Sequence, residues 1–139
     1  MSPIDPAIVR DRAQAWADTW SVAWPSRNAD AITVLQAPDG LHWSSPFEPP
    51  HEGRNGLRAY LLGSFGAETA RTRCRFAEPV VDGGRAAVEY WAQVEYGGEQ
   101  ATISGCTVLE FDEDGLVAES RDYSFFKPGH LPVPTQFDG

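Results

Sequence analysis

The spacing of apolar residues changes once along this chain, and that change constrains the fold more than any other feature of the sequence. From Arg71 onward apolar residues alternate with polar ones, the period of a β-strand buried on one face. Before it, apolar residues recur every three or four positions, as on one face of an α-helix; they include Val9, Ala13, Trp16, Trp20 and Trp24. Helices followed by strands favour an α+β fold, with the helices gathered on one face of a curled sheet.

Capping residues and prolines predict three helices in the first half. Asp5 can cap the first helix, and Pro25 is expected to end it. The helices are expected over residues 6–24, from Asn28 or Asp30 to about Gln36, and from about Asn55 to Ser64. Residues 37–40 are expected to form a turn, and residues 41–45 a short strand.

Glycine-rich turns divide the second half into four strands. Asp82-Gly83-Gly84 and Gly97-Gly98 are hairpin signals, and Asp112 to Gly115 forms a third turn. The strands are expected at residues 71–76, 86–96, 101–111 and 116–126, paired antiparallel in sequence order. After them comes a proline-rich tail that we expect to run along the surface.

Charge and residue usage exclude several classes of function. The 139 residues carry a formal net charge of −9, which would repel a phosphate backbone, so we expect no nucleic-acid partner. The chain shows no long apolar run and no secretory pattern, so we expect no membrane association. Cys74 and Cys106 are expected to be free thiols in a reducing cytoplasm. None of the three histidines has metal-ligand spacing, so we expect neither a metal nor another cofactor.

Short motifs along residues 8–126 resemble one superfamily in their order and spacing. The matching segments are Asn28-Ala29-Asp30-Ala31-Ile32, Ala37-Pro38-Asp39-Gly40, Ser45-Pro46-Phe47, residues 53–60, residues 108–115 and Arg121-Asp122-Tyr123. They resemble the nuclear transport factor 2-like superfamily, most closely its SnoaL-like branch. The resemblance implies a cone-shaped α+β barrel, in which a curved antiparallel sheet wraps a long N-terminal helix around an apolar pocket. It also implies one domain over residues 1–127 with a tail at 128–139, and a homodimer formed through the outer sheet face.

The same resemblance makes Asp122 the leading catalytic candidate. In SnoaL-like cyclases an aspartate on the last strands serves as general acid and base, and Asp122 occupies such a position. An acid inside an apolar cone loses hydration, so its pKa rises toward neutrality and it can exchange protons. The alternative is a surface ion pair with Arg121 or Arg73.

The catalytic groups of two related enzyme classes are replaced in this sequence. Ketosteroid isomerases, which belong to the superfamily that this chain resembles, use three acid or base residues. The matching positions here are Trp20, Ser45 and Thr107. At the charged pair of limonene-type epoxide hydrolases it carries Trp91 and Gln93. Neither mechanism is therefore expected.

Ten further residues are expected to shape a pocket for a hydrophobic small molecule. The alternative is that each tryptophan only packs in the core. For Glu89, the alternative is a carboxylate that is solvated or lies in an interface. His42 is expected to face outward if Trp43 faces inward, unless a bulge before Pro46 reverses the pattern. The ten are Trp16, Trp20, Trp43, Ser45, Tyr60, Glu89, Trp91, Gln93, Thr107 and Ser124.

Three functional hypotheses follow. The first is a cofactor-independent acid/base enzyme of isomerase, cyclase or dehydratase type. The second is a non-catalytic protein that binds a hydrophobic ligand in the same pocket. The third is an interaction domain whose cone is filled and has no cavity.

Overall fold

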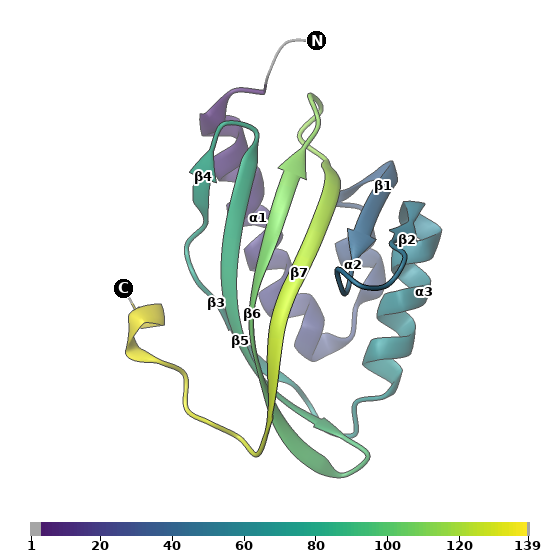
Figure 1. Cartoon of the computed structure of the whole chain (residues 1–139), viewed down its shortest axis with the longest axis vertical. Helices are drawn as coiled ribbons and strands as arrows, with labels where there is room; N and C mark the ends of the chain where they lie inside the picture. The colour runs from purple at the N-terminus through teal and green to yellow at the C-terminus, as the bar shows by residue number, and fades with distance from the viewer. Residues whose placement is uncertain (1–3, 139) are drawn as a thin grey trace.

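Three helices lie on one side of a curved sheet in the computed structural model, which describes residues 4–138 (Figure 1). The helices are α1 (Pro6–Ser26), α2 (Ala29–Thr33) and α3 (Gly53–Gly66). The strands are β1 (Gln36–Trp43), β2 (His51–Glu52), β3 (Arg73–Phe76), β4 (Val80–Asp82), β5 (Arg85–Tyr96), β6 (Glu99–Phe111) and β7 (Val117–Pro128). A 3₁₀ turn, η1 (Thr135–Asp138), follows near the C-terminus.

The order of strands in the sheet is β2-β1-β7-β6-β5-β3, and β4 also pairs with β5. Strands β5, β6 and β7 form the antiparallel series that the turn signals predict. The predicted α+β class with three helices and a curved sheet is confirmed. The sheet is mixed, because β1 pairs with β7 in the parallel sense, and it stays open along its edges.

Helix α1 is anchored at both ends by local hydrogen bonds. Asp5 Oδ1 accepts from the Ala7 amide at 2.8 Å, as predicted for a cap. Pro25 lies inside the last turn and does not end the helix; Arg27, with a left-handed φ of 56°, ends it. A proline leaves the carbonyl four residues earlier without its usual donor. Here that carbonyl belongs to Ser21, and the Cys74 thiol contacts it at 3.8 Å.

A bulge in β1 decides which of its side chains face the helices. Residues 37–40, expected as a turn, lie within β1, and the pairing with β7 jumps from Gln36 opposite Val117 to Leu41 opposite Glu119. A Cβ at Gly40 would lie 2.6 Å from Gln36 Cγ, so the bend requires glycine. As a result His42 is buried on the inner face of the sheet, while Trp43 turns outward to bond Glu119.

The tail after β7 turns back beside the lower part of the sheet (Figure 1) and contacts the outer face of β5. The Leu131 carbonyl accepts hydrogen bonds from Trp91 Nε1 at 3.0 Å and from Gln93 Nε2 at 2.9 Å. Phe137 packs edge-on against Trp91. The tail therefore covers part of the outer face. The predicted boundary between the domain (residues 1–127) and the tail (residues 128–139) remains a prediction.

None of the helices described in residues 4–138 has the length and apolar content needed to cross a bilayer. Within the same residues, no cluster of three or more His, Cys, Asp or Glu side chains could hold a metal ion.

Candidate active site

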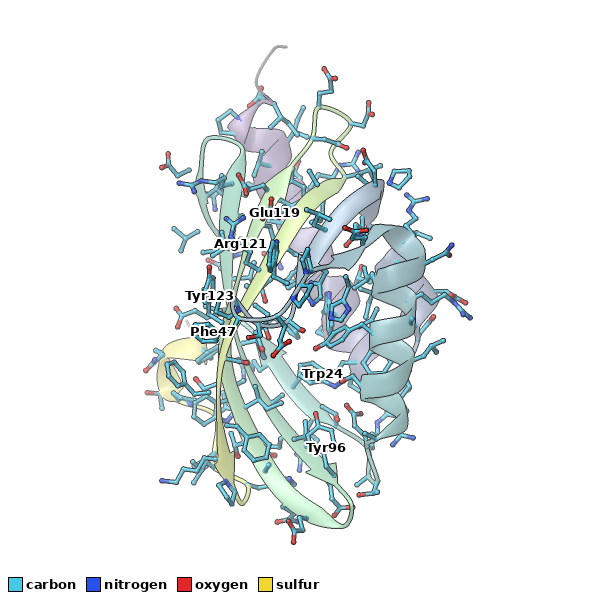
Figure 2. All side chains as sticks on the ribbon, turned by 45° about the vertical axis from the view of Figure 1, so that its right-hand side comes forward. Trp24, Phe47, Tyr96, Glu119, Arg121 and Tyr123 are labelled. Carbon is cyan, nitrogen blue, oxygen red and sulfur yellow. The ribbon has the colours of Figure 1, made fainter. Side chains whose placement is uncertain are left out.

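A cavity of about 160 Å³ lies between α1, α3 and the inner face of the sheet. Figure 2 shows Trp24 and Tyr96, two of its lining residues, in the space between the sheet and α3. The cavity contradicts the hypothesis of a filled cone. Its lining includes an apolar wall of Trp16, Trp20, Trp24, Phe65, Phe76 and Ile103, and a polar wall of His42, Ser44, Thr107, Asp122 and Ser124.

The apolar wall is built mainly by a row of indoles on α1. Trp16, Trp20 and Trp24 follow at four-residue spacing, so they share one helix face. Neighbouring ring centroids are 5.8 Å and 5.7 Å apart. Trp24 Nε1 donates to the buried Glu68 carboxylate at 2.7 Å. Among the residues with described placement, Trp20 Nε1 is the one buried side-chain nitrogen or oxygen without a hydrogen-bond partner.

Asp122 lies on the polar wall and is held by neighbouring hydroxyl groups. Its Oδ1 accepts from the Tyr90 hydroxyl at 2.7 Å and from Thr107 Oγ1 at 3.3 Å. Burial raises the pKa of the Asp122 carboxyl above its usual value, although the hydrogen bonds from Tyr90, Thr107 and Ser124 oppose that rise. The environment therefore favours a carboxyl group that exchanges a proton closer to neutral pH.

Arg121, one of the two arginines in the alternative interpretation of Asp122 as a surface ion pair, points to the opposite face of the sheet. There its guanidinium pairs with Glu110 at 2.7 Å and with Glu119 at 2.9 Å. Figure 2 shows Glu119, Arg121 and Tyr123 in succession along the outer side of β7. Since alternate residues of a strand face opposite sides, the Asp122 side chain points away from these charges. Asp122 nevertheless also borders a hollow on the outer side that Glu119 and Arg121 line.

Tyr90 reaches Asp122 because the strand between them carries a glycine. Tyr90 on β5 lies directly opposite Gly105 on β6, which in turn lies opposite Ser124 on β7. A Cβ at Gly105 would be only 2.3 Å from Tyr90 Cζ. The tyrosine ring therefore occupies the space above Gly105 and extends to the third strand. Glycine inside a strand can signal such a close approach, and this signal could have identified the pair.

His42 enters the polar wall from β1. Its Nδ1 lies 2.7 Å from Ser120 Oγ, and its ring packs against Tyr60 with centroids 5.3 Å apart. Burial, followed by the charge of His51, lowers the pKa of His42 to about 4. His42 is therefore neutral at pH 7. Burial and the nearby Asp122 also raise the pKa of Tyr60 to about 12, so its hydroxyl keeps its proton.

Six of the predicted site residues line the cavity together. They come from four elements, two helices and two strands. Whether they bind a substrate stays a prediction. The six are Trp16, Trp20, Tyr60, Thr107, Asp122 and Ser124.

The other five predicted residues lie outside this cavity. The β1 bulge turns Trp43 outward, and Ser45 Oγ instead accepts from the Phe47 amide in the following loop. Glu89, Trp91 and Gln93 share the outer face of β5, because Val88 and Tyr90 occupy its inner face. Glu89 is exposed there, while the tail binds the other two.

The open curved sheet, the long helix and the partly open cavity are consistent with the cone-shaped α+β fold of the nuclear transport factor 2-like superfamily. The SnoaL-like domain model matches residues 13–120, so the chain belongs to the SnoaL-like family. Among solved structures it is similar to the epoxide hydrolase/cyclase-like enzyme SalBIII, described for its role in pyran ring formation in the polyether salinomycin. That match has a TM-score of 0.73 and 14% identity, and covers 90% of this chain and 98% of SalBIII. At this identity the likeness shows the fold alone. No curated protein matches the sequence.

Proposed function

We propose that this chain is a cofactor-independent acid/base enzyme of isomerase, cyclase or dehydratase type, and that it acts on a hydrophobic small molecule. The observation that carries the proposal is the Asp122 carboxyl group, which lies on the polar wall of the cavity, faces an apolar wall, and is held in place by Tyr90 and Thr107. Membership of the SnoaL-like family supports the proposal at the level of the family.

Asp122 can act in either direction of a proton transfer. In its neutral form it can donate the proton to a substrate oxygen, and in its ionised form it can accept one. The hydrogen bond from Tyr90 at 2.7 Å stabilises the ionised form and fixes Oδ1. A carboxyl group with a raised pKa and a fixed orientation is suited to both steps without a cofactor.

The cavity limits the size of a buried substrate. A closed apolar cavity of about 150 Å³ holds one benzene molecule. The 160 Å³ here therefore suits one ring, or two rings if part of the ligand extends through the mouth. The indoles of Trp16, Trp20 and Trp24 offer flat apolar contacts to such a ring.

A non-catalytic ligand-binding protein is the second candidate. The specific observation in its favour is the row of three indoles, which could bind an apolar ligand without chemistry. The sequence also lacks the acid and base groups of the ketosteroid isomerases and the charged pair of the limonene-type epoxide hydrolases, with Trp20, Trp91 and Gln93 among the replacements, although Asp122 is retained.

Asp122→Asn separates the two candidates. We would measure deuterium exchange at the acidic CH₂ of 2-tetralone, a neutral bicyclic ketone, in D₂O by proton NMR, and its binding by calorimetry. The enzyme proposal expects binding to persist while exchange falls by about 100-fold or more. The control is Glu89→Gln, which removes a carboxylate from the exposed outer face. If exchange continues in Asp122→Asn, or if only the affinity changes, the binding-protein candidate is favoured.

A further inference from the structure

His42 and Asp122 are neighbours on the inner face of the sheet. His42 on β1 lies opposite Ser120 on β7, and Asp122 follows Ser120 by two residues on the same strand. Residues two apart on a strand share a face, so both side chains point toward the helices. Both line the cavity described above. The parallel pairing of β1 with β7 thus brings together two titratable groups that are 80 residues apart in sequence.

One edge of the His42 ring is left for a ligand. The side chain is only 6% exposed, and Nδ1 is occupied by Ser120 Oγ. Among the described residues no hydrogen bond reaches the second ring nitrogen, Nε2, and, unlike Trp20 Nε1, this atom is not fully buried. In the tautomer whose Nδ1–H donates to Ser120, Nε2 carries a lone pair.

The charges around His42 keep that lone pair free at neutral pH. The groups that contact the ring are His51 from β2, Tyr60 from α3 and Ser120 from β7, and the carboxyl group of Asp122 lines the same cavity. Burial and His51 disfavour the imidazolium, so the pKa of about 4 leaves His42 as a neutral base. A base of similar strength, with a pKa near 4.6, abstracts carbon-bound protons in a known isomerase.

We propose that His42 is a second catalytic residue, which accepts a proton at Nε2 while Asp122 donates one. This inference rests on the proposed function. In the step, Nε2 takes a proton from the carbon beside a substrate carbonyl, and the electron pair of that C–H bond forms the enol double bond. The carboxylic acid of Asp122 gives its proton to the carbonyl oxygen. The products are an enol, an imidazolium and a carboxylate. Both side chains are restored when the imidazolium returns a proton to carbon and the carboxylate takes back the enol O–H proton.

The test compares His42→Gln with His130→Gln in the 2-tetralone exchange assay. His130 lies on the tail and contacts the Val94 carbonyl, outside the cavity lining. We expect His42→Gln to slow exchange about 100-fold and His130→Gln to leave it unchanged. Ser120→Ala retains the imidazole but loses its orienting contact, so we expect an intermediate rate, which also guards against misfolding of His42→Gln. The wild-type rate should fall as the pH drops through about 4, and His42→Gln should lack this decrease.

The outcomes separate this inference from the proposed function. If His42→Gln retains the wild-type rate while Asp122→Asn loses it, Asp122 acts without His42 and the inference fails alone. If Ser120→Ala and His42→Gln both match wild type across the pH range, the inference is likewise overturned. If the wild-type protein does not accelerate exchange above buffer, both proposals are rejected.

Discussion

The Tyr90 hydroxyl donates a hydrogen bond of 2.7 Å to Asp122 Oδ1 from two strands away. The bond crosses β6 above Gly105, whose missing side chain leaves room for the tyrosine ring. Tyr90 and Gly105 therefore act on Asp122 from positions that sequence motifs alone did not connect with it.

Replacing Tyr90 by phenylalanine is expected to raise the pKa of Asp122 further. The hydrogen bond stabilises the carboxylate, so its loss favours the protonated form. The pKa would be measured from the carboxyl carbon shift of ¹³C-labelled aspartate, with Asp122→Asn to assign the signal. Tyr123→Phe is the matched control, because Tyr123 lies on the outer face of β7. An unchanged or lower pKa in Tyr90→Phe would show that the bond does not control this carboxyl group.

Gly105→Ala is expected to displace the Tyr90 ring. The added methyl group would overlap Tyr90 Cζ at 2.3 Å, and overpacking of this kind costs roughly 1–3 kcal/mol. We expect urea unfolding to show a lower free energy of unfolding. We also expect the pKa of Asp122 to rise, as in Tyr90→Phe, because the hydrogen bond from Tyr90 is disturbed. Gly63→Ala is the control, since a Cβ there meets nothing within 4 Å and lies in α3, where alanine stabilises a helix. Equal stability for both variants would contradict the steric explanation.

Acidification is expected to destabilise the fold through His42. Its pKa falls from 6.5 in the unfolded chain to about 4 in the native state, so protons bind the unfolded state more tightly. The stability that this group contributes is complete above pH 6.5 and is lost as the pH falls to about 4. The loss is about 3 kcal/mol. Urea unfolding at several pH values should show a smaller decrease for His42→Gln than for wild type. A parallel pH dependence in the two proteins would refute this assignment.

Homodimerisation through the outer sheet face remains a proposal, and Phe125 tests it. Phe125 is 81% exposed and Tyr123 is 45% exposed, both on the outer side of β7. An aspartate at position 125 would place a charge in an apolar interface, so Phe125→Asp is expected to convert a dimer into a monomer in light scattering. Val22→Asp, on the exposed side of α1, should leave the mass unchanged. A wild-type protein that is monomeric at all concentrations would remove the proposal.

The long elements could be predicted because each has a regular hydrophobic period and clear boundaries. The spacing from Val9 to Trp24 indicated α1, and the Gly97-Gly98 turn separated β5 from β6. Strands β2 and β4 were not predicted, because two or three residues are too few to show a period. Pairing between β1 and β7 joins distant parts of the chain, so local sequence carried no signal of its parallel sense.

The candidate site was predicted only in part, for a related reason. Asp122, Thr107 and Ser124 follow the alternation of regular strands and lie on the inner face. The orientation of β1 depended on a bulge whose position a single sequence did not define, so Trp43 was expected inside in place of His42. On β5 both faces carry large side chains, so the alternation did not show which face is the inner one. The contact between the tail and Trp91 could not be predicted from hydrophobic periodicity.

The lining of the cavity, as far as the described residues define it, contains no lysine or arginine. A carboxylated or phosphorylated molecule would have to shed its hydration shell there without a counter-ion, next to Asp122 and in a protein of net charge −9. A ligand that enters this cavity would therefore be selected for lack of negative charge, and the selection would operate at entry, before any bond in the ligand changes.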